Sequence, residues 1–387
     1  MTVRPLTVML VAAEASGDDR GAGLARALKR RLGSGVRFVG VGGEKLAAEG
    51  VRSPFDIRQL SILGLMEGLL AYPMVLRRAD ETAALAEREQ PDVAVLIDSW
   101  GFTLRVAHRL KRLGVPLVKY VAPQVWASRP GRAKTAARWF DLLLTIHTFD
   151  GPAFEREGLA VTFVGDTILS SDFAHADAAR LRRQIGAGAD DPILLVLPGS
   201  RPGEIARVMP AFENAVDRLK AERPGLHIVV LAAPTVADLV KVRVAGWPYR
   251  AHVVEGDDAK RNAMVAATVA LACSGTVTTE LALAGCPMVV GYRLGPVTHA
   301  ILKRLIRTKW VTLFNIAAQD FVAPELIQND CNGVALAGEI RMRLDDPDLR
   351  ARQVAAQSRA LLKMGRGRVG DPDDAAAVAV LKLIGRG

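Results

Sequence analysis

The chain has 387 residues, of which half are hydrophobic and only 5% are aromatic. This length suits about two packed domains, and a core of Val, Leu, Ile and Ala favours an α/β fold with buried parallel strands over a β-sandwich. The net charge of +10 predicts attraction to nucleic acid, an anionic membrane or a phosphorylated substrate, unless the surplus arginines only solvate helix surfaces. RNP-like aromatics, zinc-finger spacing and a basic tract with interleaved aromatics are all missing, which argues against nucleic acid.

A metal site and a membrane span are also not expected. The three cysteines, Cys273, Cys286 and Cys331, have no metal-ligand spacing and suit a reducing compartment, and the six histidines form no HExxH motif. The first apolar run is soon followed by Glu14 and lacks a signal-peptide cleavage site, and no apolar stretch reaches the roughly 20 residues that span a bilayer. We therefore expect a cytoplasmic protein without a metal or other cofactor.

Strand and helix patterns alternate through the first part of the chain. Short apolar runs predict strands at residues 7–13, 36–43, 91–98, 116–123 and 141–147. Helical patterns such as LARALKRRL and VAHRLKRL lie between them. The alternation predicts a doubly wound parallel sheet in an N-terminal Rossmann-like domain, residues 1–170.

The same alternation begins again in the second part of the chain. Further strands are predicted at residues 192–198, 226–234, 250–256, 267–275 and 286–292, and the polar, glycine-containing segment 179–192 is expected to be a linker. We assign residues 185–345 to a second Rossmann-like domain and residues 346–387 to a pair of C-terminal helices that pack back toward the first domain. Two such domains facing each other across a cleft are the architecture of a GT-B glycosyltransferase.

Two loops of the second domain suit an anionic ligand. Backbone amides after a strand and at a helix start bind phosphate, and an arginine adds a fixed bidentate charge. A well-capped helix, with Ser200 as the cap of the first, explains the same residues, so two such loops together favour a nucleotide more than either alone. The candidate residues are Gly199, Ser200, Arg201 and Glu204 in the first loop, and Ser274, Gly275, Thr276 and Glu280 in the second.

Carboxylates follow two strands of the first domain. Asp98 ends the strand PDVAVLID, where a general base is oriented by the fold, although a helix cap or a salt bridge is the alternative. The segment EASGDD follows the first strand and either caps a helix or lines the acceptor side of a cleft; its candidate residues are Glu14, Ser16, Gly17 and Asp18.

One stretch is more apolar than a surface helix requires. Residues 61–76 carry a single charge, Glu67, and contain Leu65, Met66, Leu69 and Leu70, which could receive acyl chains or enter a bilayer interface. A core helix is the alternative. The basic segment ILKRLIRTKW would suit anionic lipid, although solvated Lys and Arg are its usual explanation.

An ordered set of motifs spans nearly the whole chain and resembles the lipid A disaccharide synthase family. These motifs are EASGD (14–18), VGVGG (39–43), LGLMEGL (63–69), PDVAVLID (91–98), YVAPQVWA (120–127), FVGD (163–166), LPGSRPGE (197–204), SGTVTTE (274–280), PMVVGYR (287–293), LFNI (313–316) and PELIQ (324–328). The resemblance implies a GT-B-like inverting glycosyltransferase of Gram-negative lipopolysaccharide synthesis that works peripherally at the inner membrane. It would join UDP-2,3-diacylglucosamine to 2,3-diacylglucosamine 1-phosphate, giving the β-1,6 lipid A disaccharide and UDP.

The resemblance also assigns residues and partners. It makes Asp98 the base and places Arg201, Ser274, Gly275, Thr276, Glu280, Asn315 and Gln328 around the nucleotide. The partners it implies are acylated glucosamine lipids and an anionic membrane surface. It leaves the oligomeric state open. The remaining alternatives are a GT-B-like UDP-hexosamine 2-epimerase and a non-catalytic lipid- or nucleotide-binding relative.

The chain departs from the usual family motifs at four places. It reads IDSWGFT, YVAPQVWAS, FVGD and IHTFD where the family commonly has IDAPDFN, YVSPSVWAW, FVGH and LPFE. All four lie in or beside the half expected to hold the acceptor. We therefore expect them to affect acceptor identity more than nucleotide binding.

Overall fold

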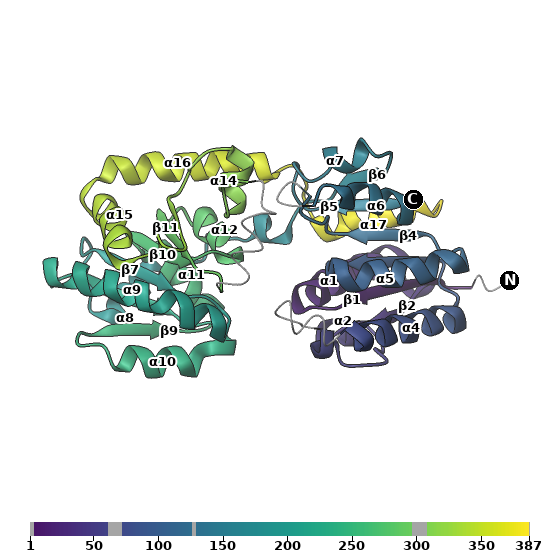
Figure 1. The fold of residues 1–387 in the computed structure, drawn as a ribbon, viewed down its shortest axis with the longest axis horizontal. Coiled ribbons are helices and arrows are strands. Elements are labelled where there is room, and N and C mark those ends of the chain that lie inside the picture. Colours follow the sequence, from purple (N-terminus) through teal and green to yellow (C-terminus); the bar gives the residue numbers. More distant parts are fainter. Residues whose placement is uncertain (1–3, 61–71, 126–128, 296–307, 387) are drawn as a thin grey trace. The chain divides into compact units, whose positions relative to one another are not determined.

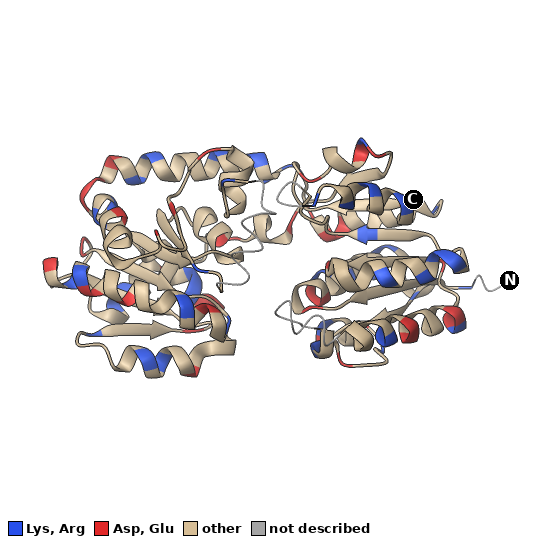
Figure 2. Cartoon of the chain, viewed as in Figure 1, with Lys and Arg blue, Asp and Glu red and all other residues tan. Residues whose placement is uncertain are grey.

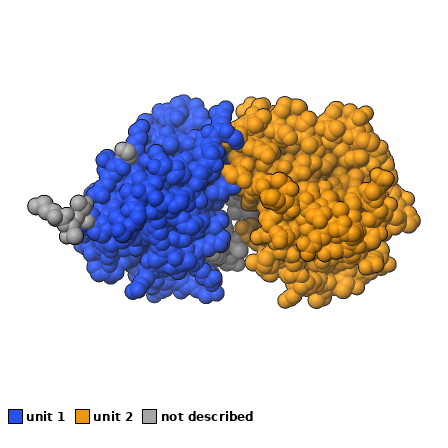
Figure 3. Space-filling model, turned by 180° about the vertical axis from the view of Figure 1, so that it is seen from behind, with its two compact units in different colours: residues 1–167, 305–307, 367–387 blue, residues 168–304, 308–366 orange. Residues whose placement is uncertain are grey.

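The computed structural model describes residues 4–60, 72–125, 129–295 and 308–386. Among these, residues 4–167 and 367–386 form one compact unit, here called unit 1, and residues 168–295 and 308–366 form another, called unit 2 (Figure 3). Each unit is a parallel sheet with helices on its faces (Figure 1). This confirms the α/β class and the doubly wound sheets expected from the alternating pattern.

Unit 1 contains a six-stranded parallel sheet in the order β2-β1-β3-β4-β5-β6. Its strands are β1 (Leu6–Ala12), β2 (Val36–Val41), β3 (Val93–Ile97), β4 (Leu117–Tyr120), β5 (Leu142–Thr145) and β6 (Ala160–Phe163). Strands β1, β3, β4 and β5 are buried along their whole length, because helices cover both faces of the sheet. Alternate side chains therefore enter two different cores.

One face of this sheet packs against α1 (Ala15–Leu32) and α17 (Pro372–Leu383), and the other against α4 (Tyr72–Glu89), α5 (Trp100–Leu110) and α6 (Gly131–Trp139). Helix α1 lies close to the strands because it carries glycines on its inner side. A Cβ at Gly21 would come within 2.9 Å of the Ile97 side chain. Two short helices, α2 (Glu44–Ala48) and α7 (Pro152–Glu155), complete the unit.

Unit 2 contains a second six-stranded parallel sheet, in the order β12-β11-β10-β7-β8-β9. Its strands are β7 (Ile193–Leu197), β8 (His227–Leu231), β9 (Ala251–Val254), β10 (Val269–Cys273), β11 (Met288–Tyr292) and β12 (Glu325–Ile327). One face packs on α9 (Pro202–Glu222), α10 (Ala237–Ala245) and α15 (Gly333–Asp345) in a single core. The other face contacts α11 (Asp257–Ala266) and α12 (Thr276–Leu283).

The remaining helices of unit 2 are α8 (Ala178–Ile185), α14 (Leu313–Ala318) and α16 (Pro347–Met364). Helix α16 is anchored by two buried glutamines: Gln353 and Gln357 donate to the carbonyls of Met288 and Cys286, 2.8 and 3.1 Å away. Short 3-10 turns occupy Gly33–Gly35, Ile57–Leu60, Lys111–Leu113, Thr167–Ser170 and Pro234–Val236.

Two expectations about the connecting segments are wrong in part. The segment 179–192 does not form only a linker, because most of α8 lies in it and packs on α11; a run of charged residues hid the helix. Of the expected pair of C-terminal helices, α17 does pack on the first unit, where it contacts α1, but α16 belongs to unit 2, where it packs on α14 and α12.

Charge is spread over both units. In Figure 2, basic and acidic segments are interspersed along the helices of each unit, so the surplus of positive charge is not one continuous basic tract there. Among the described residues, no helix is both long enough and apolar enough to cross a membrane.

Candidate functional site

Both sheets contain one point at which the strand order reverses. In unit 1 the chain passes to opposite sides of β1, so the reversal lies between β1 and β3; in unit 2 it lies between β7 and β10. Loops diverge at such a point, and open α/β sheets bind ligands there, outside the carboxyl ends of the strands. The predicted site residues 14–18 and 98 follow β1 and β3, and residues 199–204 and 274–280 follow β7 and β10.

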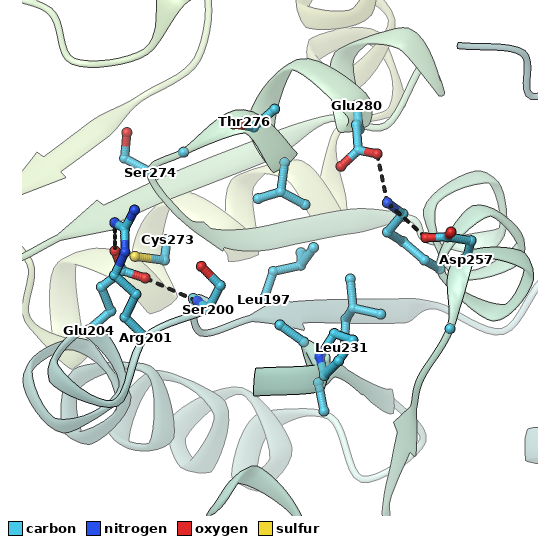
Figure 4. A pocket seen from close by; sticks show the side chains of 18 residues that line it. Leu197, Ser200, Arg201, Glu204, Leu231, Asp257, Cys273, Ser274, Thr276 and Glu280 are labelled. Atoms are coloured by element: carbon cyan, nitrogen blue, oxygen red, sulfur yellow. Dashed lines mark hydrogen bonds and ion pairs between the residues drawn. The ribbon is translucent and has the colours of Figure 1, made fainter. Parts of the chain in front are cut away.

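A pocket of about 350 Å³ opens at the reversal point of unit 2 (Figure 4). All four candidates of the first loop and all four of the second line it, so two segments some 75 residues apart in sequence meet in one cavity. Further walls come from the ends of β8 and β9. The lining residues are Leu197, Gly199, Ser200, Arg201, Glu204, Leu231, Ala232, Ala233, Pro234, Gly256, Asp257, Lys260, Cys273, Ser274, Gly275, Thr276, Val277 and Glu280.

The turn after β7 depends on a glycine. Gly199 has a φ of 113°, a conformation that L side chains rarely adopt. A Cβ at this position would lie 2.8 Å from Glu204 Oε2 and 3.0 Å from its Cβ. The turn can therefore approach the first turn of α9 closely only without a side chain at position 199.

Glu204 fixes this turn from inside the protein. Its buried carboxylate accepts a hydrogen bond from the Ser200 amide at 3.0 Å and pairs with Arg201 Nη1 at 2.9 Å. Arg201 itself is the N-cap residue of α9, and no side chain caps the helix, so the alternative in which Ser200 is the cap is wrong. The uncapped first turn leaves the positive end of a 21-residue helix beside the pocket.

The loop after β10 presents a second helix start to the pocket. Helix α12 begins at Thr276 after the N-cap Gly275, again without a side-chain cap. The buried Thr278 hydroxyl donates to the Gly275 carbonyl at 2.7 Å, which holds the loop from behind and leaves Ser274 and Thr276 on the pocket side (Figure 4). Two uncapped helix starts thus meet in one cavity, an arrangement that favours an anion.

Sequence reasoning missed one cation of the pocket. Lys260 Nζ lies 2.7 Å from Glu280 Oε1 and 3.5 Å from Asp257 Oδ1 (Figure 4). Its partner Glu280 is 20 residues away in sequence, so no local spacing marks the pair. Asp257 and Asp258 form the first turn of α11. The chain therefore places two cations and three carboxylates around the pocket.

The floor of the pocket is apolar. Leu197, Leu231 and Val277 line it together with Cys273, whose burial raises the pKa of the thiol to about 12. A thiol of that pKa stays protonated at neutral pH and behaves as a small apolar group. The pocket therefore combines an apolar floor with polar groups around it, as a base-and-phosphate ligand requires.

Two predicted nucleotide residues do not line this pocket. Asn315 is buried; its amide donates to the Ala323 carbonyl at 2.9 Å, and its oxygen accepts from the Val322 amide at 2.9 Å and the Ala323 amide at 3.1 Å. Gln328, in a left-handed conformation with φ of 55°, accepts from the Leu294 amide at 2.7 Å. Both side chains hold loops after α14 and β11 in place.

In unit 1, Asp98 lies at the reversal point of the sheet. Strands β1 and β3 pair in parallel with Ala12 opposite Ile97, so Asp98 and the loop after β1 leave the sheet at the same edge. Asp98 and Ser99 have φ of 50° and 35°, and two consecutive non-glycine residues in that region carry backbone strain of about 1–3 kcal/mol each. The Asp98 amide donates to the Tyr120 carbonyl at 2.9 Å, and its carboxylate accepts from the Ser99 amide at 2.9 Å.

The other unit 1 candidates have separate surroundings. Glu14 is the exposed N-cap residue of α1, and Ser16 is exposed in its first turn. Gly17 packs against β1, where a Cβ would lie 3.4 Å from that of Ala12. Asp18 is buried and accepts hydrogen bonds from the backbone amides of residues 43, 45 and 46 at 2.7–3.1 Å, so its carboxylate anchors the start of α2.

Two departures from the family motifs contact each other. His147, from IHTFD, and Asp166, from FVGD, follow the neighbouring strands β5 and β6, and His147 Nε2 lies 3.8 Å from Asp166 Oδ2. His147 Nδ1 is 3.2 Å from Asp150 Oδ2, and Arg20 of α1 pairs with Asp166 at 3.1 Å. These changes therefore form one buried charged cluster. At the IDSWGFT departure, Trp100 packs against Phe140, with ring centroids 6.4 Å apart.

Two other expectations concern lipid and metal. Leu65, Met66, Leu69 and Leu70 lie outside the described residues, as does most of the segment ILKRLIRTKW. In the part of the chain that is described, no group of three or more His, Cys, Asp or Glu side chains is placed to hold a metal ion.

Comparison with known proteins identifies the family. The model of the lipid-A-disaccharide synthetase family matches residues 8–378. The lipid-A-disaccharide synthase of Rhodospirillum centenum is 41% identical over 384 residues, which cover 99% of this chain and 96% of that protein. The same enzyme of Paramagnetospirillum magneticum is 42% identical over 386 residues, covering 99% and 98%.

Solved structures with low sequence identity share the fold. The S. aureus MnaA–UDP co-structure has a TM-score of 0.65 at 14% identity, covering 99% of this chain and 98% of that one. MurG of Acinetobacter baumannii has a TM-score of 0.56 at 15% identity, covering 98% and 100%. The fold is therefore GT-B-like, and the chain belongs to the lipid-A-disaccharide synthase family, glycosyltransferases of lipid A biosynthesis.

Proposed function

We propose that this chain transfers 2,3-diacylglucosamine from UDP to the 6-hydroxyl of 2,3-diacylglucosamine 1-phosphate, with inversion at the anomeric carbon. The proposal assigns the nucleotide to the pocket of unit 2 and the attacking hydroxyl to the reversal point of unit 1. The two uncapped helix starts beside one pocket are the observation that carries it, because they supply backbone donors for a diphosphate.

The pocket supports a nucleoside diphosphate in three ways. Its apolar floor suits a base, its helix starts and Arg201 suit the phosphates, and Glu280 can accept hydrogen bonds from ribose hydroxyls. Arg201 is the exposed partner of the buried Glu204. Its Nη1 is held by the Glu204 carboxylate, and the other N–H donors of the guanidinium remain for a ligand. Charge that builds on the leaving diphosphate is thereby stabilised.

Asp98 is the proposed base. As the acceptor oxygen attacks C1 of the donor sugar, its proton passes to the Asp98 carboxylate, the C1–O bond to UDP breaks, and UDP leaves with the bonding electrons. The carboxylate is half-buried and held by the Ser99 amide, which orients it at the edge of the sheet. No metal ion or organic cofactor takes part in the proposed step.

We further propose that the protein acts peripherally at the cytoplasmic surface of the inner membrane. Both substrates carry acyl chains, and one carries a phosphate. A chain with a net charge of +10 is attracted to anionic lipid headgroups, and the apolar stretch at 61–76 would receive acyl chains.

The experiment is an assay of UDP release by the purified protein in detergent. With both the donor and the monosaccharide 1-phosphate, UDP is released steadily, and EDTA does not change the rate. With either substrate omitted, release stops. No release with both substrates would contradict the proposal, and release that needs no acceptor would point to hydrolysis of the donor instead.

A further inference from the structure

A lysine is buried beneath the proposed base. Lys119 lies on β4, and only 1% of its surface is exposed. Its neighbours in the sheet register are Leu96 of β3 and Leu143 of β5, both members of the apolar core shared with α5. A charged group in such surroundings is costly unless it has partners, so its presence calls for a role.

The amine of Lys119 contacts the turn that carries Asp98. Its Nζ donates to the Asp98 carbonyl oxygen and lies 3.1 Å from the Thr103 hydroxyl of α5. That hydroxyl is in turn 3.0 Å from the carbonyls of both Asp98 and Ser99. Lys119 and Thr103 therefore hold, from inside the sheet, the two residues whose φ angles are positive.

We propose that Lys119 is a positioning residue of the transfer reaction, which acts through Asp98 by holding the strained Asp98–Ser99 turn from beneath with its buried amine. This inference rests on the proposed function, in which Asp98 is the base. Lys119 itself touches no substrate in this account.

The charge state of Lys119 couples the turn to pH. Desolvation lowers the pKa of its amine to about 7, while the nearby acidic groups, Asp98 itself and Glu14 after β1, raise it. The groups that face it from the flanking strands and α5 are uncharged: Leu96, Leu143 and the Thr103 hydroxyl. Its amine is charged below about pH 7 and uncharged above it, and a positive charge there opposes proton transfer onto Asp98.

Two substitutions separate the two parts of this role. Lys119→Met removes both the donor and the charge, and we expect kcat to fall about 10- to 100-fold because the base is misplaced. Lys119→Gln keeps an N–H donor without the charge and should retain more of kcat than the Met variant. Lys111→Met, at a half-buried ion pair with Asp141 in the same unit, is the matched control and should leave kcat unchanged.

The experiment measures kcat, KM for the UDP-sugar and UDP affinity across neutral pH for these variants. In the wild type kcat rises as pH passes about 7, and in both Lys119 variants this rise is absent. UDP affinity stays at the wild-type value, because the pocket belongs to unit 2. The double variant with Asp98→Asn and Lys119→Met should lose no more of kcat than Asp98→Asn alone, since the effects of residues that act as a unit are not additive.

Several results would overturn the inference. It is wrong if Lys119→Met keeps the wild-type kcat, or if Lys119→Gln keeps the rise of kcat with pH. Should the Met variant not fold, the pH profile of the Gln variant decides alone. Full activity of the Asp98→Asn variant would exclude Asp98 as the base and with it the proposed mechanism. If Asp98→Asn is impaired but both Lys119 variants behave as the wild type does, only the role of Lys119 is excluded.

Discussion

The two units share a plan and differ in what their loops place at the point where the strand order reverses. In unit 2 this point carries glycine turns, two uncapped helix starts and a pocket of about 350 Å³. In unit 1 it carries a carboxylate on strained backbone above a buried lysine. Two sheets of similar order are thus followed by loops that favour an anion in unit 2 and by a held carboxylate in unit 1, because the chemical character of each site resides in its loops and not in the fold.

Removing the proposed base gives the largest expected effect. Asp98→Asn keeps the size of the side chain but not its ability to take a proton, so we expect kcat to fall by about 10²- to 10⁴-fold. Affinity for UDP, measured by calorimetry, should not change, because Asp98 and the pocket belong to different units. The control is Asp80→Asn, an exposed carboxylate of unit 1 that pairs with Arg109. Unchanged turnover in Asp98→Asn would exclude it as the base.

A change at Gly199, in the turn after β7, tests the role proposed for the pocket of unit 2. Gly199→Ala forces a Cβ against Glu204 at a positive φ, and we expect it to lower the unfolding free energy by about 1–3 kcal/mol and to weaken UDP binding. Thermal denaturation and a UDP titration measure both effects. Gly225→Ala is the control, because no atom lies within 4 Å of its Cβ. A Gly199→Ala variant that binds UDP as the wild type does would contradict the role given to this turn.

The smallest effect is expected at the ribose side of the pocket. Glu280→Gln removes the negative charge from the proposed hydrogen-bond acceptor of the ribose, and we expect about a tenfold loss of UDP affinity. A UDP analogue without ribose hydroxyls should bind both proteins alike, and Glu255→Gln, at an ion pair with Lys241, should have no effect. Equal losses for UDP and the analogue would show that Glu280 does not meet the ribose.

Much of the fold could be predicted because buried parallel strands have continuous apolar sequences. The run PDVAVLID predicted β3, and PILLVLP predicted β7. Strands β6 and β12, which have four and three residues and are not fully buried, were not anticipated. Helix α8 was taken as part of a linker because its charged side chains and the glycines after it resemble a loop.

The candidate site was predictable only where local sequence carries the signal. Glycine turns at the ends of apolar runs marked both loops of the pocket. Lys260 gave no signal, because its pairing with Glu280 depends on tertiary structure, and the same is true of the burial of Lys119 in β4. Glu204 was expected beside the nucleotide, yet its carboxylate holds the turn that lines the pocket.

The central claim, that the chain joins two acylated sugars, is tested most directly by mass spectrometry of the product. The donor and the acceptor carry acyl chains of different mass, so each contributes a distinct label. We predict one product whose mass is the sum of both acylated sugars with a single 1-phosphate, formed together with UDP. A donor sugar that is consumed without being joined to the acceptor, or an isomer of unchanged mass, would contradict the account.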